Sequence, residues 1–139
     1  MAITTAMCTS FKKELFEATH DFTSDTFKIA LFTSSATLNA STTAYSTSNE
    51  ISGSGYGAGG VALTVVAPAT DGTSAIVDFN DPSWTSASFT ANGALVYNSS
   101  KSNKAVAAFA FGGDQTVSSG TFTITIPAAA SGTAVVRID

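Results

Sequence analysis

The stretch KAVAAFAFGGDQTVSSGTFTITIP, residues 104–127, decides the fold class of this chain. Its first arm, Ala105–Phe111, is apolar at every position, which is typical of a strand buried on both faces. Its second arm, Thr121–Ile126, alternates threonine with apolar residues, the pattern of a strand with one face in a core. Between them lies the polar segment Gly112–Gly120, with glycine at both ends. The stretch therefore predicts a hairpin-like pair of strands joined by a loop.

The whole chain of 139 residues is about the size of one domain, and we expect a single β-sandwich domain over residues 1–139. With one cysteine, Cys8, the chain cannot form an internal disulfide. Charged residues are 12% of the chain and the net charge is −4. Because the basic residues are few and scattered, we expect no nucleic-acid partner. No apolar run approaches transmembrane length, and we expect neither a signal peptide nor a membrane partner.

Residues 1–22 are expected to form an N-terminal arm with one amphipathic helix. Apolar residues at four-residue spacing from Met7 to Leu15 predict a helix over residues 4–19, capped by a threonine near its start. The alternative is a shorter helix that begins at Ser10 and follows an extended segment. Neither helix is stable alone, so it must pack on the sheet or on a neighbouring subunit.

Six further strands are expected along the chain, bounded by turn-forming residues. They are Thr26–Thr33, Val61–Ala67, Ala75–Phe79, Ser88–Thr90, Ala94–Asn98 and Ala134–Ile138. With the opening stretch they give about seven or eight strands and no alternating helices, the pattern of an antiparallel β-sandwich or barrel. Residues 34–60 are expected to form a long surface excursion, and Trp84 is expected to close one end of the core.

The glycine-rich segment 55–60 matches the dinucleotide-binding pattern G-x-G-x-x-G letter for letter. That pattern needs a helix after the glycines to receive the pyrophosphate, whereas a β-branched strand follows here. We therefore predict a bend at which the chain passes close to a neighbouring backbone. His20 and Asp21 lie side by side among many serines, but the chain has no G-x-S-x-G turn. We interpret His20 as a residue at the C-terminal end of the helix, favoured there by the helix dipole.

Acidic residues in turns are the remaining candidates for chemistry. Asp78, Asn80 and Asp81 carry oxygens that suit calcium, but their spacing lacks the calcium-loop pattern, and a turn bonded by its own side chains explains them. A glycosidase-like pair of carboxylates remains open among Asp71, Asp78, Asp81 and Asp114. One cysteine and one histidine cannot complete a transition-metal site. The sequence therefore predicts no catalytic residue, no cofactor and no metal site.

Five stretches stand out together and span nearly the whole chain. They are FKKELFEATHDFTSDTFKIALFTSSATL (11–38), TTAYSTSNEISGSGYGAGGVALT (42–64), ALVYN (94–98), FGGDQTVSSGTFTITIP (111–127) and VVRI (135–138). In this order they resemble small structural proteins of tailed bacteriophages, among which capsid decoration or cement proteins fit best by size.

This resemblance implies a non-enzymatic virion protein on the capsid surface, assembled in the host cytoplasm. Such a protein typically forms a homotrimer, binds the major capsid protein on the outer head surface and stabilises contacts between capsomers. The resemblance implies that the N-terminal segment or the long loop grips the capsid, and it assigns no role to a single residue.

Two other classes of function remain open. A phage tail-tip or fibre module would bind a host surface glycan or receptor through exposed aromatic residues on loops, such as Tyr45, Tyr56 and Trp84. A decoration protein would instead bury these three rings against the capsid or a sister subunit. A small glycan-cleaving enzyme would require converging carboxylates.

Overall fold

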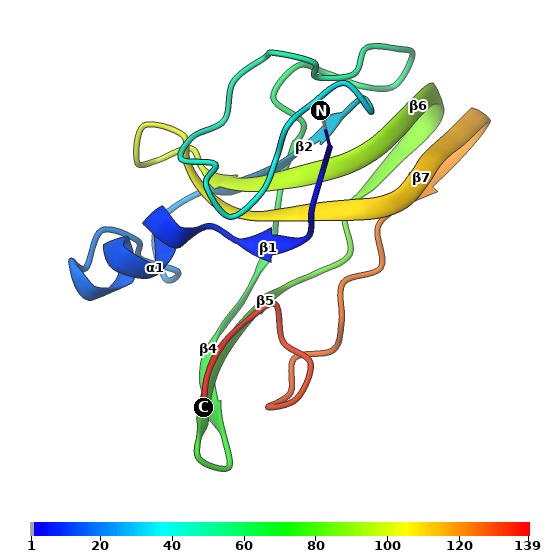
Figure 1. Ribbon diagram of the computed structural model, residues 1–139. Coiled ribbons are helices and arrows are strands. Elements are labelled where there is room, and N and C mark those ends of the chain that lie inside the picture. The colour runs from blue at the N-terminus through cyan, green and yellow to red at the C-terminus, as the bar shows by residue number, and fades with distance from the viewer. Residues whose placement is uncertain (1) are drawn as a thin grey trace.

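Two antiparallel β-sheets and one short N-terminal helix make up the computed structural model, which describes residues 2–139 (Figure 1). The elements in chain order are β1 (Ala6–Met7), α1 (Thr9–Phe16), β2 (Phe27–Phe32), β3 (Val61–Ala62), β4 (Val65–Asp71), β5 (Ser74–Phe79), β6 (Ser83–Asn98), β7 (Lys104–Thr123) and β8 (Val136–Ile138). The larger sheet has the strand order β1-β7-β6-β2-β3 and the smaller sheet the order β4-β5-β8. The predicted fold class, a mainly β antiparallel sandwich with one N-terminal helix, is confirmed.

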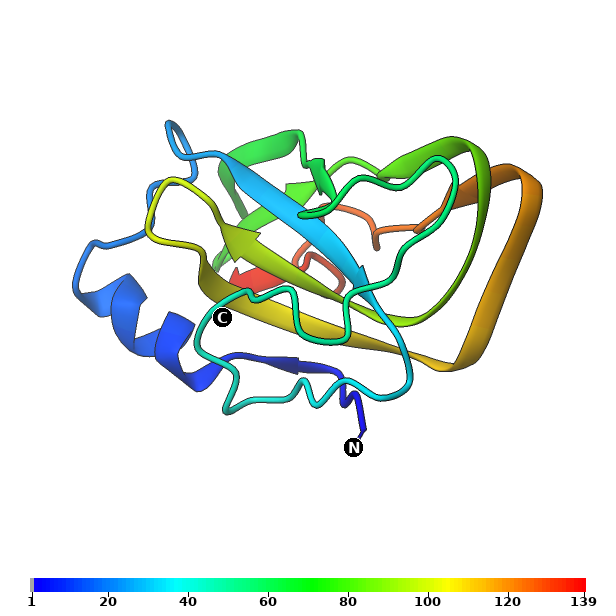
Figure 2. The same cartoon turned by 90° about the horizontal axis from the view of Figure 1, so that it is seen from above.

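Three layers are stacked on one another in Figures 1 and 2. The larger sheet lies in the middle, with the smaller sheet on one face and the long segment 33–60 across the other. Alternate residues of β2 therefore reach different layers. Phe27 packs toward Phe79 of the smaller sheet with ring centroids 5.9 Å apart, whereas Phe32 packs toward Tyr45 of the long segment at 6.5 Å. β2 confirms the strand predicted there, and the long segment explains why both of its faces are buried.

β7 corrects the prediction for the stretch that decides the fold class. Residues 112–120 are not a loop between two strands. They belong to β7, which runs without a break from Lys104 to Thr123 and is 20 residues long. The glycine pair Gly112–Gly113, at φ 79° and 152°, is an irregularity within the strand and not a turn. β6 supplies a partner along this whole length, and the register shifts between Ala91 and Gly93, where extra residues of β7 bulge out. β6 is one continuous strand that contains both of the strands predicted at Ser88–Thr90 and Ala94–Asn98.

The N-terminal arm follows the alternative with the shorter helix. β1 pairs with β7 in antiparallel register, and α1 begins only at Thr9. Because the backbone of β1 is hydrogen-bonded to the sheet, it cannot form helical hydrogen bonds, so the helix predicted over residues 4–19 is too long. Cys8 is the N-cap residue and makes no side-chain capping bond. Phe11 is the buried anchor of the helix.

The strand predicted at Val61–Ala67 is divided between the two sheets. β3 pairs with β2 in the larger sheet, whereas β4 pairs with β5 in the smaller one. At the crossing, Leu63 donates its backbone N–H to the carbonyl of Phe27 at 2.8 Å. Pro68 lies where the register of the edge strand β4 shifts, a position that tolerates its missing N–H. β5 confirms the strand predicted there, and β8 is shorter than predicted.

The long segment 33–60 is held against its neighbours by backbone contacts. Tyr45 donates its N–H to the carbonyl of Asn103, next to β7, at 2.9 Å. Gly60 lies so close to β2 that a Cβ there would be 1.7 Å from the carbonyl oxygen of Ile29, and its φ is +76°. The glycine-rich segment is therefore a bend pressed against a neighbouring backbone, as predicted.

Trp84 lies at one end of the core, as predicted, and is only 3% exposed. Its ring packs edge-on against Phe89 and Phe122, with centroids 6.4 and 6.0 Å away. Its indole N–H is buried and has no hydrogen-bond partner within residues 2–139. This end of the ribbon formed by β6 and β7 is therefore closed by aromatic packing alone.

Candidate interaction surface

Two large apolar side chains protrude from the surface at the same place. Phe16 is 94% exposed and Ile138 is 63% exposed. Both line a hollow of about 450 Å³ between the C-terminal end of α1 and β8. The other residues that line it are Met7, Lys12, Leu15, Val136 and Arg137. We call these seven residues the α1–β8 groove.

Local geometry explains why these side chains are exposed. An α-helix turns by about 100° per residue, so Phe16 points away from the sheet on which the buried Phe11 lies. β8 is the edge strand of the smaller sheet. Val136 is buried in it, whereas Ile138, two residues later on the same face, lies at the rim.

The groove is apolar along its length and basic at its sides. It continues past Leu15 and Ile138 into a second, mainly apolar hollow of about 150 Å³ over β4 and β5. Both of its charged residues, Lys12 and Arg137, are basic. The groove therefore fits a partner surface that presents apolar side chains with carboxylates beside them.

A buried polar cluster fixes α1 next to the groove. The ring of His20 contacts Glu14 Oε1 through Nε2 at 2.9 Å and Asn98 Nδ2 through Nδ1 at 3.0 Å. Asn98 also donates to Asp25 Oδ2 at 2.8 Å, and its Oδ1 accepts the backbone N–H of Ser100 at 3.0 Å. These two partners fix the orientation of the amide, so Nδ1 of His20 must accept and Nε2–H must donate to Glu14.

The prediction that His20 is a C-terminal helix residue is wrong. α1 ends at Phe16 and Glu17 is its C-cap, so His20 lies beyond the helix. Its imidazole is hydrogen-bonded to Glu14 of α1 and to Asn98 of β6, which holds the segment after the helix against the sheet. The contacts of His20 are those of a structural residue that fastens the helix to the larger sheet.

Hydrogen bonds also stabilise the charge of two aspartates in the turn after the helix. Burial by itself would raise the pKa of Asp25. Hydrogen bonds from Asn98 and from the backbone N–H of Asp21, together with the charge of Lys101, outweigh burial and leave the pKa of Asp25 below its usual value. Hydrogen bonds from the side chain and backbone of Thr23 lower the pKa of Asp21. Both carboxylates therefore favour the folded turn when they are ionised.

A second buried cluster fixes the long segment 33–60 on the other face of the larger sheet. The carboxylate of Glu50 accepts hydrogen bonds from the hydroxyls of Tyr45 and Tyr56, at 2.7 and 2.6 Å, and from the N–H of Gly59 at 2.7 Å. The hydroxyl of Tyr97 donates to the carbonyl of Gly59 at 2.7 Å. Burial, and then the carboxylate of Glu50, raises the pKa of Tyr45 and of Tyr56.

The three aromatic residues proposed for glycan binding are packed inside the chain itself. Tyr45 stacks on Tyr97 with ring centroids 4.4 Å apart, and both Tyr45 and Tyr56 bind Glu50. Trp84 is buried among other rings. These contacts do not provide the exposed aromatic rings on loops that the tail-module alternative requires, because the long segment folds back on the sheet.

The four carboxylates considered for a glycosidase-like pair each accept a hydrogen bond from a different part of the chain. Asp71 accepts the N–H of Ser131 at 2.7 Å, Asp78 that of Phe79 at 2.9 Å, Asp81 that of Ile126 at 2.7 Å, and Asp114 the amide of Asn92 at 2.9 Å. The turn interpretation does not hold for these two residues, because Asp78 lies within β5 and bonds the next strand residue, whereas Asp81 bonds a distant segment. In the part of the chain that the structure describes, no three His, Cys, Asp or Glu side chains gather as a metal site would require.

The single cysteine is buried next to α1. Burial, and then the charge of Glu14, raises the pKa of Cys8 to about 11. The thiol is therefore protonated at neutral pH, and a protonated thiol is a poor nucleophile and a poor metal ligand.

The α1–β8 groove was not predicted from the sequence. Its only local signals are the adjacent pair Leu15–Phe16, in which a second apolar residue lies beside the helical stripe, and Ile138 at the end of the last strand. Neither signal shows that α1 and β8 meet, because this depends on the pairing of β8 with β5.

Across residues 2–139, the one helix is far shorter than a membrane crossing requires. Comparison of the chain with protein-family models, with curated proteins and with solved structures finds no match.

Proposed function

We propose that this protein is a non-enzymatic structural component of a virion, a decoration or cement protein that binds the outer head surface and stabilises contacts between capsomers. The observation that carries the proposal is the α1–β8 groove, which leaves Phe16 and Ile138 in water. We place the protein in a virion because its sequence stretches, in their order, resemble small structural proteins of tailed bacteriophages.

The physical chemistry of the groove supports a role in assembly. Covering Phe16 stabilises an interface by about 2 kcal/mol for this side chain alone. The groove is continuous with the apolar hollow over β4 and β5, so one partner can cover both. A stable assembly buries roughly 2,000 Å² or more, and a chain in which only 12% of the residues are charged is well suited to this.

A second copy of the chain is the partner that we propose for the groove, within a homotrimer. A ring of three copies uses a heterologous contact, in which two different patches of the same chain meet. The chain carries a net charge of −4, so a second copy can supply carboxylates to Lys12 and Arg137. Because four of the seven groove residues belong to the N-terminal arm, the long segment is the candidate that remains for the major capsid protein.

Sedimentation equilibrium of purified protein, followed by binding to capsids that lack it, tests this proposal. We expect a trimer, and we expect Phe16→Asp to shift it to monomers with an unchanged circular dichroism spectrum. Lys13→Asp is the matched control, because Lys13 is exposed on the same helix outside the groove. Monomeric wild-type protein that does not bind capsids would contradict the proposal.

A further inference from the structure

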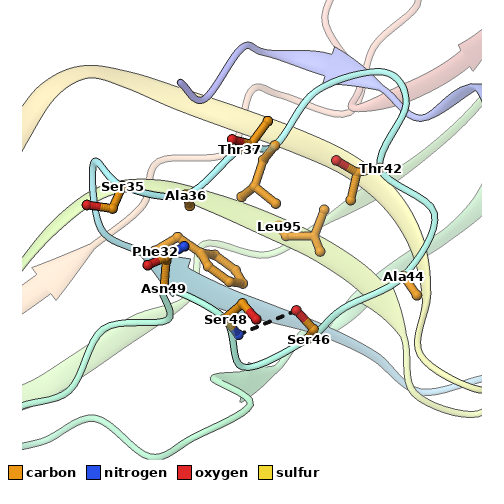
Figure 3. Close-up of a pocket in the computed structure, with 11 residues that line it drawn as sticks. Phe32, Ser35, Ala36, Thr37, Thr42, Ala44, Ser46, Ser48, Asn49 and Leu95 are labelled. Carbon is orange, nitrogen blue, oxygen red and sulfur yellow. Dashed lines mark hydrogen bonds between the residues drawn. The ribbon is translucent and has the colours of Figure 1, made fainter. Parts of the chain in front are cut away.

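A separate hollow of about 410 Å³ lies on the other face of the larger sheet, beneath residues 35–49 (Figure 3). Phe32 of β2 and Leu95 of β6 form its floor, and the long segment surrounds it. Its volume is within the range of pockets that hold small ligands. Six of its side chains carry a hydroxyl or an amide: Ser35, Thr37, Thr42, Ser46, Ser48 and Asn49.

The lining of this hollow is polar but uncharged. None of its eleven described lining residues is acidic or basic. An ionic ligand would lose its hydration without gaining a counter-charge. A purely apolar ligand would cover hydroxyl groups without offering them hydrogen bonds. The chemistry that fits is a neutral molecule that carries both hydroxyl groups and apolar C–H faces.

Several hydroxyl groups are free to bind such a molecule. The side chains of Thr37 and Ser48 are exposed and make no hydrogen bond within residues 2–139. The hydroxyl oxygen of Thr42 accepts the backbone N–H of Asn39 at 3.0 Å, which leaves its O–H available as a donor. The hollow thus offers both donors and acceptors around an apolar floor.

Hydrogen bonds at both ends of the segment hold the walls of the hollow in place without a ligand. Thr33 donates its N–H to the carbonyl of Asn49 at 2.9 Å, which closes the segment at its base. Ala105 of β7 donates its N–H to the carbonyl of Thr43 at 3.0 Å, and the cluster around Glu50 fixes the far end. A rigid pocket loses little conformational entropy on binding, which favours affinity for a small ligand.

We propose that this hollow binds a neutral saccharide. Sugar rings present equatorial hydroxyl groups at their edges and C–H groups on their faces, which match the hydroxyl walls and the apolar side chains of Leu38 and Ala44 among them. Phe32 and Leu95 support this lining from beneath, at 2% and 0% exposure. This site is distinct from the aromatic residues first considered for glycans, and it is independent of the α1–β8 groove. It would add attachment to a glycosylated surface to the structural role.

Titration of ¹⁵N-labelled protein, followed by amide chemical shifts, tests the proposal. The probes are neutral mono- and disaccharides of glucose, galactose, mannose and N-acetylglucosamine, with glucuronate and hexane-1,6-diol as charged and flexible comparisons. We expect saturable shifts confined to residues 32–49 and Leu95, with dissociation constants on the order of 1 mM. Thr37→Val and Ser48→Ala remove hydroxyls that the fold does not use, and each should weaken binding about fivefold.

Thr47→Val and Ser41→Ala are the matched controls, since both residues are exposed on the same segment outside the hollow. They should leave the dissociation constant unchanged. The proposal is overturned if none of the neutral saccharides gives saturable shifts, if the shifts map elsewhere, or if glucuronate or the diol binds as tightly. Equal loss in the control variants would also contradict it, because the pocket hydroxyls would then not be specific.

Discussion

The two covers of the larger sheet differ in how completely they are closed. On one face, the long segment 33–60 lies over β2 and β6, and its Glu50 cluster and backbone bonds leave no large aromatic ring exposed there. On the other side, α1 and β8 cover the core but leave Phe16 and Ile138 in solvent. The first cover leaves no large hydrophobic side chain exposed, whereas the second leaves two that another molecule can cover.

This difference shows that loop length is a poor guide to where a protein leaves large hydrophobic side chains exposed. The irregular segment 33–60 is the more fully packed cover, because backbone hydrogen bonds at Thr43, Tyr45 and Ile51 tie it to β7, to the turn before β7 and to β2. The regular elements α1 and β8 form the incomplete one, because one is short and the other is an edge strand. The following predictions test this contrast.

The largest effect is expected from Gly60→Ala. The added methyl group would collide with the carbonyl oxygen of Ile29, 1.7 Å away, at a φ of +76° that a residue with a Cβ seldom adopts. We expect a loss of about 4 kcal/mol in the free energy of unfolding, measured by urea denaturation. Gly57→Ala is the matched control, since a Cβ there meets no atom within 4 Å. Equal stability of the two variants would show that the segment is not pressed against β2.

A smaller loss is expected from Glu50→Gln. The amide can accept hydrogen bonds through one oxygen only, so at least one of the donors from Tyr45, Tyr56 and Gly59 is left without its partner. We expect a loss of about 2 kcal/mol and faster amide hydrogen exchange confined to residues 33–60. Glu17→Gln, on the exposed surface of the helix, should change neither quantity. Uniform exchange throughout the protein would contradict a local role for the cluster.

The pH dependence of stability should separate the two covers. Because the pKa values of Tyr45 and Tyr56 are raised in the folded protein, their stabilisation is complete below about pH 10 and is lost as the pH rises further. The pKa values of Asp21 and Asp25 are lowered, so their stabilisation is present above about pH 4 and is lost as the pH falls. Hydrogen exchange should therefore increase first in the long segment in alkali and first around α1 in acid. The reverse order would contradict these assignments.

The smallest effect on the isolated chain is expected from Phe16→Ser. Its side chain is 94% exposed, so the free energy of unfolding should change by less than about 0.5 kcal/mol at protein concentrations where the chain is monomeric. Phe11→Ala, in the same helix but fully buried, should cost about 3 kcal/mol or more. A large loss from Phe16→Ser at low concentration would show that this residue supports the fold and not an interface.

Local patterns in the sequence predict much of this fold. The alternation at Thr26–Thr33 predicts β2, and the glycines before Val61 predict a bend against a neighbouring backbone. The glycines at 112 and 113 do not show whether the chain turns there or continues as a strand with a bulge, because both structures favour glycine. The presence of β6 along the whole of β7 decides between the two, and this partner is distant in the sequence.

The candidate surfaces were less predictable for the same reason. Tyr45 and Tyr56 occur in a segment that the sequence predicts as a surface excursion, and only the position of Glu50 beside both hydroxyls shows that they pack against the core. Phe16 is a large hydrophobic residue of the kind usually found in a core. Only the structure shows that it lies at the last position of α1, where its side chain is exposed. Whether an aromatic ring is inside or outside is therefore decided by tertiary contacts that a single sequence does not display.

The pairing of β1 with β7 has a consequence for the order of events in synthesis. Ala6 pairs with Ala108, so β1 leaves the ribosome well before the strand with which it pairs. Strands β4 and β5, and after them β6 and β7, are neighbours in the chain joined by short turns, so each pair can form as soon as it has been made. We therefore expect pulse-labelled hydrogen exchange during refolding to protect β6 and β7 before β1, and the N-terminal arm to be the last part to become protected.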